Sequence, residues 1–290
     1  RRPDPHGPMA SVGNHLLGST VHDVVERVLK ASLRDTKPQG VDEAVEVVWP
    51  SESTLSAWCE EAAAKKLLED GIAWPGLARA VVGRALEAIK LLRALDDQHE
   101  VQAVWGAEQE LSVSLPDGPT IRFRVDRLER VQGRPMLTDF KLGKPRTVAK
   151  TEGTRRKHIL EAVRRGELLQ GALYARAVED GSGRYVYLNP SKDFPQRVFQ
   201  MSADDEELQG HMEAAVGELE EVMRQGSMFP RLVTSKGENQ KACDFCSVRE
   251  ACLRDDSTLR RQLLEAVEAE PESPASRARR ALWVGGASDE

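Results

Sequence analysis

The stretch Thr120–Leu142, TIRFRVDRLERVQGRPMLTDFKL, is the most informative part of the chain. It predicts two β-strands, with Asp126 on the first and Asp139, Phe140 and Lys141 on the second. Because side chains alternate along a strand, Asp139 and Lys141 share one face, and Phe140 points into the opposite layer. If the two strands are neighbours, Asp126 joins that face. Paired carboxylates hold divalent cations, and a nearby lysine can steady a hydroxide or a developing phosphorane charge. The alternative is two solvated strand faces with ordinary charges.

Further strands are expected on both sides of this stretch, and together with it they form an antiparallel meander followed by a strand pair. The additional strands are expected at residues 101–113, 184–188 and 196–200. Glu108 and Glu110 share one face of the first of them. One of these glutamates can approach the metal, although exposed strand glutamates are the commoner case.

Apolar residues at helical spacing predict helices before and after the meander. The expected helices cover residues 14–32, 54–68, 76–94, 159–178 (with a break near Arg165 and Gly166), 204–224 and about 258–269. This order indicates an α/β class, with a mixed central sheet flanked by helices and an N-terminal helical insertion. The expected division is a flexible lead-in at 1–13, one domain at 14–255 (helical part about 14–98, α/β core about 100–225), and a short helix with a disordered tail at 256–290.

The composition is that of a soluble globular protein, with 30% charged and 40% hydrophobic residues. A chain of 290 residues can bury one good core. No apolar run reaches the length needed to cross a bilayer, and the first residues lack a signal-peptide core, so no membrane contact and a cytoplasmic location are expected. Because the chain opens with Arg1 rather than Met, we expect a processed or excised segment of a longer protein.

The net charge of -6 does not by itself indicate nucleic-acid binding, but a local basic stretch can bind phosphate on an acidic protein. Such a stretch begins directly after the second strand of the opening segment. Its basic residues are Lys144, Arg146, Lys150, Arg155, Arg156, Lys157, Arg164 and Arg165. The alternative is a solvated charged face without a ligand.

Three of the four cysteines are closely spaced, as Cys243-x2-Cys246-x5-Cys252. Three thiols within ten residues can surround one soft metal centre, and Cys59 is the only other cysteine. The four cysteines together therefore suffice for a site with four thiolate ligands. Zinc and a [4Fe–4S] cluster are both compatible with such a site. We interpret this cluster as a structural staple at the end of the domain.

Taken together, these motifs resemble the PD-(D/E)xK nuclease superfamily, in the RecB/AddB-like branch that includes exonuclease V and the CRISPR-associated iron–sulfur nucleases. The matching stretches come in the family's order and cover about residues 14 to 255. They are Gly18-Ser-Thr-Val-His22, Arg124-Val-Asp126-Arg127, Thr138-Asp139-Phe-Lys141, Gln170-x3-Tyr174, and the cysteine run after Gly226-Ser-Met-Phe-Pro230. Each stretch is weak alone, and the five in order are specific.

The resemblance implies a restriction-endonuclease-like core and a role for each matched residue. His22, Asp126 and Asp139 would bind Mg²⁺ or Mn²⁺ together with the backbone carbonyl of Phe140, and Lys141 would position or activate the attacking water. Gln170 and Tyr174 would brace the site and touch the DNA backbone. The cluster ligands would be Cys59, Cys243, Cys246 and Cys252, and the strand path would use Lys144, Arg146, Arg155, Arg156, Lys157, Arg164 and Arg165. This chemistry needs a metal to offset phosphorane charge and cations along the strand.

The chain departs from the family pattern at two positions. Phe123 stands where the family usually has a glycine, three residues before Asp126. Cys59 follows His22, whereas the first cluster cysteine of this branch normally precedes the histidine motif. This order puts the fourth cluster ligand in doubt and leaves the acidic site untouched.

We therefore predict a metal-dependent deoxyribonuclease that acts on single-stranded DNA or duplex ends. The resemblance also implies a helicase domain or subunit as partner, because the chain has no Walker A motif of its own. Two rival interpretations are a degenerate nuclease fold kept for DNA binding and a zinc-stapled regulatory protein. The complete Asp126, Asp139 and Lys141 set favours the enzyme.

Overall fold

The computed structural model describes residues 13–34, 36, 38, 40–72, 74–98, 103–116, 118–189, 197–226, 256–258, 261, 262 and 265. Residues 1–12 of the expected lead-in (1–13), the cysteine trio and most of the expected C-terminal helix and tail lie outside these residues. The chain divides into two compact units. The first comprises residues 1–113, 122–148 and 173–203, and the second comprises 114–121, 149–172 and 204–290.

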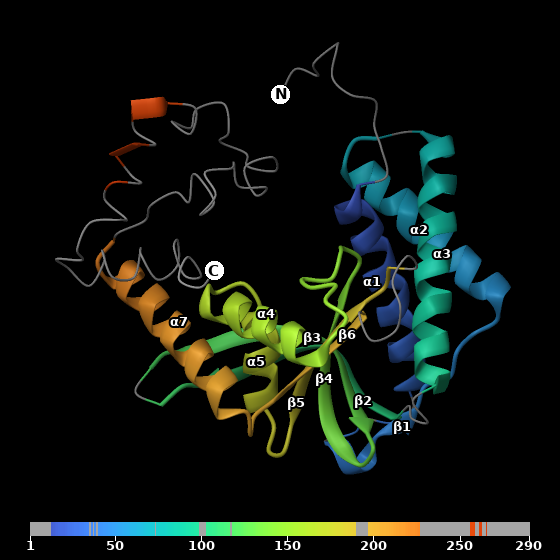
Figure 1. Cartoon of the computed structure of the whole chain (residues 1–290). Helices are drawn as coiled ribbons and strands as arrows, with labels where there is room; N and C mark the ends of the chain where they lie inside the picture. The colour runs from blue at the N-terminus through green and yellow to red at the C-terminus, as the bar shows by residue number, and fades with distance from the viewer. Residues whose placement is uncertain are drawn as a thin grey trace. The chain divides into compact units, whose positions relative to one another are not determined.

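The central element is a six-stranded sheet in the order β1-β2-β3-β4-β5-β6 (Figure 1). The strands are β1 (Val45–Glu46), β2 (Ala103–Ser114), β3 (Thr120–Val131), β4 (Arg134–Lys141), β5 (Ser182–Tyr187) and β6 (Val198–Ser202). β4 pairs with β5 in parallel, whereas β1 with β2, β3 with β4 and β5 with β6 are antiparallel. The sheet is therefore mixed, which confirms the expected α/β class and meander. β1 is an addition that the sequence did not predict.

A two-residue turn fixes the register of β3 against β4. Gln132 and Gly133 have φ values of 50° and 80°, and Val131 pairs directly with Arg134. Positive φ at both central residues is the signature of a type I′ turn, whose twist matches that of a hairpin. Glycine adopts this conformation without strain, so the sequence Gln-Gly at this point sets how β4 lies against β3.

Three long helices, α1 (Asn14–Ser32), α2 (Glu52–Glu69) and α3 (Pro75–Gln98), belong to the first unit, with a short 3-10 turn at Val41–Glu43. α2 begins at Ser51, whose hydroxyl accepts a hydrogen bond from the Thr54 N–H, and α3 begins at a proline, which suits a first helical position. Their apolar faces form one core with Phe140 and Val186 of the sheet. The helical part is thus a layer packed on the sheet, where the sequence suggested an insertion.

The opposite face of the sheet carries a second apolar cluster. Val125 and Leu128 of β3, Leu137 of β4 and Tyr174 of α5 (Leu169–Arg176) form it. Phe140 lies in the first core and Leu137 in the second, as strand alternation requires. The predicted opposition of Phe140 to the Asp139 face is confirmed.

In the second unit, α4 (Glu152–Arg164) packs against α7 (Glu206–Arg224). The predicted helix at 159–178 is wrong in where it begins. It starts earlier, because the Thr151 hydroxyl accepts from the Thr154 N–H and caps α4. The predicted break near Arg165 and Gly166 is confirmed, because Gly166 adopts a φ of 75° that ends α4 before α5 begins.

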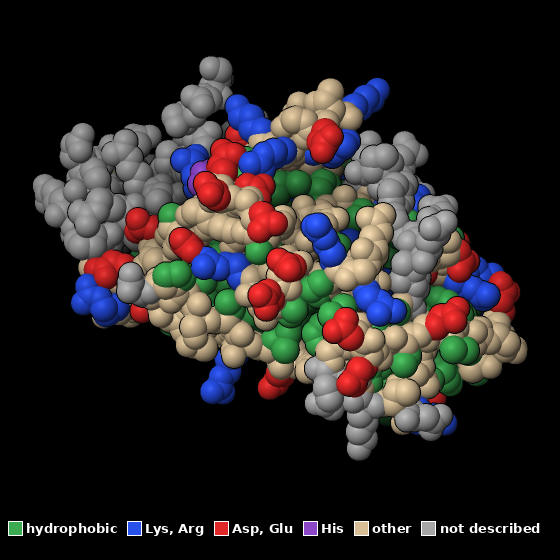
Figure 2. Space-filling model, turned by 90° about the horizontal axis from the view of Figure 1, so that it is seen from below, with side chains coloured by type: hydrophobic (Ala, Val, Ile, Leu, Met, Phe, Trp, Pro, Cys, Tyr) green, Lys and Arg blue, Asp and Glu red, His purple; other side chains and the backbone are tan. Residues whose placement is uncertain are grey.

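The surface carries charges of both signs. On the face seen in Figure 2, Lys and Arg side chains alternate with Asp and Glu, and hydrophobic side chains show between them. No helix among the described residues is both long enough and apolar enough to cross a membrane.

Candidate metal centre

Three side chains from three elements of the first unit converge beside the middle of β3. His22 on α1, Glu108 on β2 and Asp126 on β3 each offer a ligand atom, and these atoms lie within 4.8 Å of one another. His22 Nδ1 is 3.5 Å from Asp126 Oδ1 and 3.9 Å from Glu108 Oε1. We call these three residues the cleft cluster. Imidazole and carboxylate groups at this separation can share one divalent cation.

The peptide of Phe140 orients two members of the cleft cluster. Its N–H donates to Asp126 Oδ2 at 2.7 Å, and its carbonyl oxygen is 3.0 Å from His22 Nε2. When His22 donates from Nε2 to this carbonyl, the neutral ring turns its Nδ1 lone pair toward the two carboxylates. A hydrogen bond from one ring nitrogen to a backbone carbonyl is the usual way in which a metal-binding histidine is oriented.

The end of a strand ladder explains why Asp126 is available. The β3–β4 pairing ends at Arg127 opposite Thr138. One residue further, the Phe140 N–H bonds the Asp126 side chain in place of a β3 carbonyl. The backbone ladder therefore ends at the point where the Asp126 side chain reaches the cavity wall.

Asp139 and Lys141 form an ion pair beside the cleft cluster. Lys141 Nζ is 2.8 Å from Asp139 Oδ2, and it lies 5.8 Å from the centre of the Tyr185 ring. Burial and the charge of Asp126 raise the pKa of Asp139, Lys141 and His22 oppose them, and the resulting pKa is about 6. The charges of Asp126 and His22 thus influence the pKa of Asp139, although Asp139 is not one of the three converging residues. The predicted grouping of Asp126, Asp139 and Lys141 on one region of the sheet agrees with this arrangement.

Glu108 is the member of the cleft cluster that sequence reasoning did not select. Its φ of 48° is unusual for a residue other than glycine and marks a local break in the regular alternation of β2. Arg124 Nε is 2.7 Å from Glu108 Oε2 and 3.3 Å from the Glu108 carbonyl oxygen. The pair Glu108 and Glu110 on one strand was a signal, but strand periodicity did not distinguish one from the other. Glu110 is exposed.

The protonation of His22 shows how strongly this site attracts positive charge. Burial lowers the pKa of His22, but hydrogen bonds to Asp126 and Glu108 and the charge of Asp126 outweigh it and raise the pKa to about 10. Without a metal, the imidazolium balances part of the negative charge of the two carboxylates. A divalent cation would meet the same demand and would displace that proton.

The cleft cluster opens to solvent through a cavity of about 520 Å³. Cations from three elements line this cavity around the acidic residues: Lys66 of α2, Arg124 of β3 and Lys141 of β4. His22 and Lys141 are 31% and 40% exposed, so a ligand in the cavity can reach both. An anionic ligand in this cavity would meet the cleft cluster and these three cations together.

Tyr174 and Gln170 occupy different environments on α5. Tyr174 is fully buried, stacks 5.1 Å from Phe123, and donates from its hydroxyl to the Arg124 carbonyl at 2.7 Å. It braces the strand that carries Asp126, and its burial leaves no surface for a ligand. Phe123, at the position where the family has glycine, supplies the ring on which Tyr174 packs. Gln170 is exposed one turn earlier and belongs to the second unit.

The basic stretch is partly engaged in contacts within the protein. Arg156 is bound by Asp205, with one bond of 2.7 Å and one of 3.1 Å, and also by Glu207. Arg155 donates to the carbonyls of Ala149 and Lys150. The exposed members of the stretch are Lys144, Arg146, Lys150, Arg156, Lys157 and Arg164. Arg165 is 3.7 Å from Glu161.

Cys59 is fully buried in the core formed by α1, α2 and α3. Burial raises the pKa of its thiol to about 11, so the protonated form is favoured at this position. The other predicted cluster ligands, Cys243, Cys246 and Cys252, lie outside the described residues. In the part that is described, Cys59 packs as a small apolar side chain.

Comparison with known proteins adds the family. No curated protein sequence matches the chain significantly. Among solved structures, the crystal structure of SSO0001 is 13% identical, with 84% of this chain and 98% of that chain covered and a TM-score of 0.32. A candidate exonuclease from Eubacterium rectale is 15% identical, with 70% and 76% covered and a TM-score of 0.38. The model of one family, described as the PD-(D/E)XK nuclease superfamily, matches residues 3–253. The chain belongs to the PD-(D/E)XK nuclease superfamily.

Proposed function

We propose that this nuclease is a Mg²⁺- or Mn²⁺-dependent deoxyribonuclease with exonuclease-type action on single-stranded DNA or duplex ends. The observation that carries the proposal is the convergence of His22, Glu108 and Asp126 in an open cavity that is also lined by Lys141, the ion-pair partner of the buried Asp139. These donors fit a hard divalent cation, because carboxylate oxygens and one imidazole supply them and their charge demands compensation.

Each residue of the cavity then has a task in phosphodiester hydrolysis. His22, Glu108 and Asp126 would hold the cation, with Asp139 on the adjoining strand. Bound there, a divalent cation offsets charge on the phosphate and lowers the pKa of water. Lys141 reaches the cavity and can orient a water molecule or hydroxide toward the phosphorus atom. Asp139, whose pKa is about 6, can hold a proton near neutral pH.

The DNA backbone would be held by cations on the cavity wall. Lys66, Arg124 and Lys141 line it within the first unit. The basic stretch, of which Lys144, Lys157 and Arg164 are exposed, is a second candidate surface for the strand. Phosphate contacts of this kind add affinity without sequence preference and make binding salt-dependent.

We further propose that the chain belongs to the RecB/AddB-like branch and works with a helicase domain or subunit. The support is the ordered set of motifs, including the Cys243-x2-Cys246-x5-Cys252 run. A [4Fe–4S] cluster is the proposed occupant of the cysteine site, with structural Zn²⁺ as the alternative. The burial of Cys59 in an apolar core does not favour it as the fourth ligand.

A cleavage assay tests the enzymatic proposal. The protein, purified anaerobically, is incubated with end-labelled single-stranded DNA and Mn²⁺ or Mg²⁺, and Asp139→Ala and Lys141→Ala should abolish product formation. Glu110→Gln is the matched control, because Glu110 is an exposed acid on the same strand as Glu108. Equal activity in the wild type and both active-site variants would disprove the mechanism. Binding of DNA without any cleavage would favour the rival interpretation of a non-catalytic DNA-binding module.

Metal analysis tests the cysteine site separately. A brown protein with iron, inorganic sulfide and thiolate-to-iron absorbance would support the [4Fe–4S] cluster. One equivalent of zinc without iron would instead support the structural Zn²⁺ site. Cys246→Ser should lower thermal stability more than it lowers cleavage per folded molecule. Cys59→Ala should leave the iron or zinc content unchanged if Cys59 is only a core side chain.

A further inference from the structure

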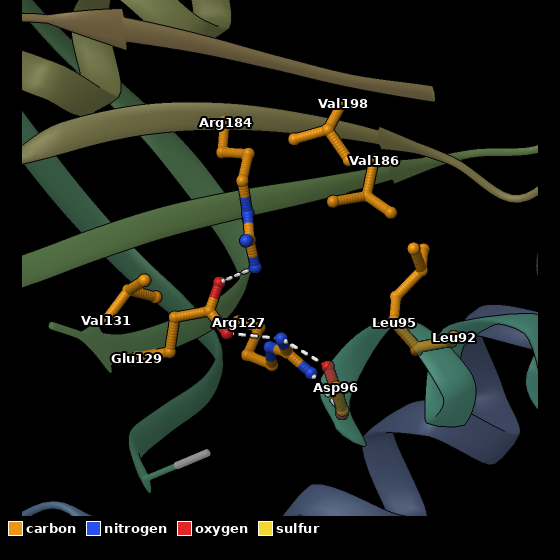
Figure 3. A pocket seen from close by; sticks show the side chains of 9 residues that line it. All are labelled: Leu92, Leu95, Asp96, Arg127, Glu129, Val131, Arg184, Val186 and Val198. Carbon is orange, nitrogen blue, oxygen red and sulfur yellow. Dashed lines mark hydrogen bonds and ion pairs between the residues drawn. The ribbon is translucent and has the colours of Figure 1, made fainter. Parts of the chain in front are cut away.

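A set of charged and polar side chains lies buried in the first unit, and Figure 3 draws its four charged members. Its members are Asp96 of α3, Arg127 and Glu129 of β3, Thr138 of β4 and Arg184 of β5; we call it the buried network. Arg127 donates through both terminal nitrogens to the two oxygens of Asp96, each at 2.9 Å, and also pairs with Glu129. Arg184 pairs with Glu129 and donates to Thr138 Oγ1 at 3.1 Å, and the Thr138 hydroxyl donates to Glu129.

The buried network is sealed from solvent and balanced in charge. Arg127 and Glu129 are each 1% exposed, and Leu92, Leu95, Val186 and Val198 surround the group, as Figure 3 shows. Two guanidinium groups face two carboxylates. Replacing such buried ion pairs with apolar side chains often leaves stability unchanged or improves it. Stability alone therefore does not account for these side chains.

The positions of the network residues along the strands suggest a second role. Arg127 directly follows Asp126, and Thr138 directly precedes Asp139. Arg127 is the register partner of Thr138, which in turn pairs with Arg184. Because neighbours on a strand point to opposite faces, the buried network lies on the sheet face opposite to the one that carries Asp126 and Asp139.

Arg127 also contacts the residue that orients the cleft cluster. Its guanidinium carbon lies 5.5 Å from the centre of the Phe140 ring. The Phe140 N–H donates to Asp126, and the Phe140 carbonyl oxygen lies 3.0 Å from His22 Nε2. The link from Asp96 to the cleft cluster thus runs through one guanidinium, one ring and one peptide. A guanidinium held at both ends by carboxylates is a rigid platform for a ring.

We propose that Arg127 is a positioning residue for the metal centre: held by Asp96 and Glu129, it fixes the Phe140 peptide and the backbone at Asp126 so that the cleft cluster is preformed. The proposal rests on the metal-site part of the proposed function. It assigns the buried network a role in the geometry of the site, which it never touches directly. Residues that orient metal ligands typically affect metal affinity about 10- to 100-fold.

Two charge-balanced double variants separate positioning from stability. The first, Asp96→Asn with Arg127→Met, removes one acid and one base. Because it removes Arg127, it also removes the group that supports the Phe140 ring. Glu129→Gln with Arg184→Met removes the same charges from the same network and keeps the Arg127–Asp96 pair. Mn²⁺ affinity is measured on each full-length variant by the electron paramagnetic resonance of free Mn²⁺, and thermal unfolding is followed in parallel.

We expect the variant without Arg127 to bind Mn²⁺ about 10-fold or more weakly, and the variant that keeps Arg127 to lose less than about threefold. Arg127→Lys should recover only part of the affinity, because an ammonium cannot span Asp96 and support the ring. Affinity that follows the unfolding temperature in both double variants would overturn the proposal. So would wild-type affinity in the variant without Arg127.

A variant that leaves every charge in place covers the case in which the first double variant fails to fold. Phe140→Leu removes the ring that Arg127 supports, and we expect a several-fold loss of Mn²⁺ affinity. Unchanged affinity in Phe140→Leu would overturn the proposal by itself. These Mn²⁺ titrations contain no DNA and are independent of the cleavage assay. A wild type that binds Mn²⁺ here but gives no product in the cleavage assay would disprove the nuclease function and leave the positioning role standing. A wild type that binds no Mn²⁺ would overturn both.

Discussion

Two groups of charged side chains have members on β3, and they differ in how their charges are balanced. The cleft cluster sets the carboxylates of Glu108 and Asp126 against one imidazole, and it opens to solvent. The buried network sets two carboxylates against two guanidinium groups and is sealed. A group whose charges are already balanced maintains geometry. A group in which two carboxylates share one imidazole is ready to bind a cation, and β3 carries members of both groups.

Removing the carboxylate of Asp139, beside the cleft cluster, should produce the largest change. Asp139→Asn should lower cleavage roughly 10³-fold, because the variant loses the charge at the metal centre. The metal-free variant should nevertheless unfold at a higher temperature than the wild type. Burial raises the pKa of Asp139 to about 6, so the ionised form is disfavoured in the folded state.

The sign of the pH dependence follows from that shift. Below the ordinary pKa of 3.8 the folded and unfolded states are both protonated, and the stability cost grows as pH rises and is complete above about pH 6. The gain in Asp139→Asn should reach about 2–3 kcal/mol at pH 8, at about 1.4 kcal/mol per pKa unit. Calorimetry in a chelator measures it, with Asp97→Asn as an exposed control. A variant that is less stable than the wild type at pH 8 would contradict the assignment.

The buried network should respond in the opposite sense. Glu129→Gln should destabilise the fold by roughly 3–5 kcal/mol, because it leaves two guanidinium groups with too little negative charge. Burial raises the pKa of Glu129, but the charges of Arg127 and Arg184 outweigh it and lower the pKa below its ordinary 4.5. Its contribution is therefore present above about pH 4.5 and is lost as the pH falls through the lower folded value.

Denaturant titrations at pH 7 and at about pH 3.5 test this behaviour. The difference in unfolding free energy between wild type and Glu129→Gln should shrink at the acid pH, while Glu110→Gln should match the wild type at both. A difference that does not depend on pH would mean that Glu129 is not ionised in the network.

A third prediction concerns the acid that sequence reasoning did not select. Glu108→Gln should weaken Mn²⁺ binding by about 10-fold or more, since it removes one negative oxygen donor, and should reduce cleavage at limiting metal. Glu110→Gln should change neither quantity. Titration with Mn²⁺ followed by cleavage at saturating metal separates affinity from turnover. Equal affinities in the two variants would remove Glu108 from the metal centre.

The smallest effect is expected at the wall of the cavity. Lys66→Ala should raise KM about three- to tenfold with little change in kcat, and should reduce the salt dependence of DNA binding by about one unit of the logarithmic slope. Lys65 is the matched control, because it neighbours Lys66 on α2 but is exposed and does not line the cavity. If Lys65→Ala and Lys66→Ala behave alike, the strand does not pass Lys66.

The hairpin and its alternation could be predicted from the sequence, because strand periodicity and a Gln-Gly turn are local signals. His22 could be predicted only through the family motif, since α1 and β3 are joined by no local pattern. Glu108 could not, because one positive φ value changes which way a side chain points without changing its residue type. The contact of Arg127 with Asp96 spans 31 residues, so neither local sequence predicts it.

The two-residue turn at Gln132 and Gly133 makes chain length between the aspartates a strict requirement. One inserted residue in this turn would shift β4 by one position and exchange its two faces. Asp139 would then enter the sealed core, and Thr138 would take its place on the face that Asp126 shares. The turn between β2 and β3, at 115–119, imposes no such exchange on β3 and β4. In related chains we therefore expect insertions and deletions to accumulate in the β2–β3 turn, while the number of residues separating the aspartates at 126 and 139 stays constant.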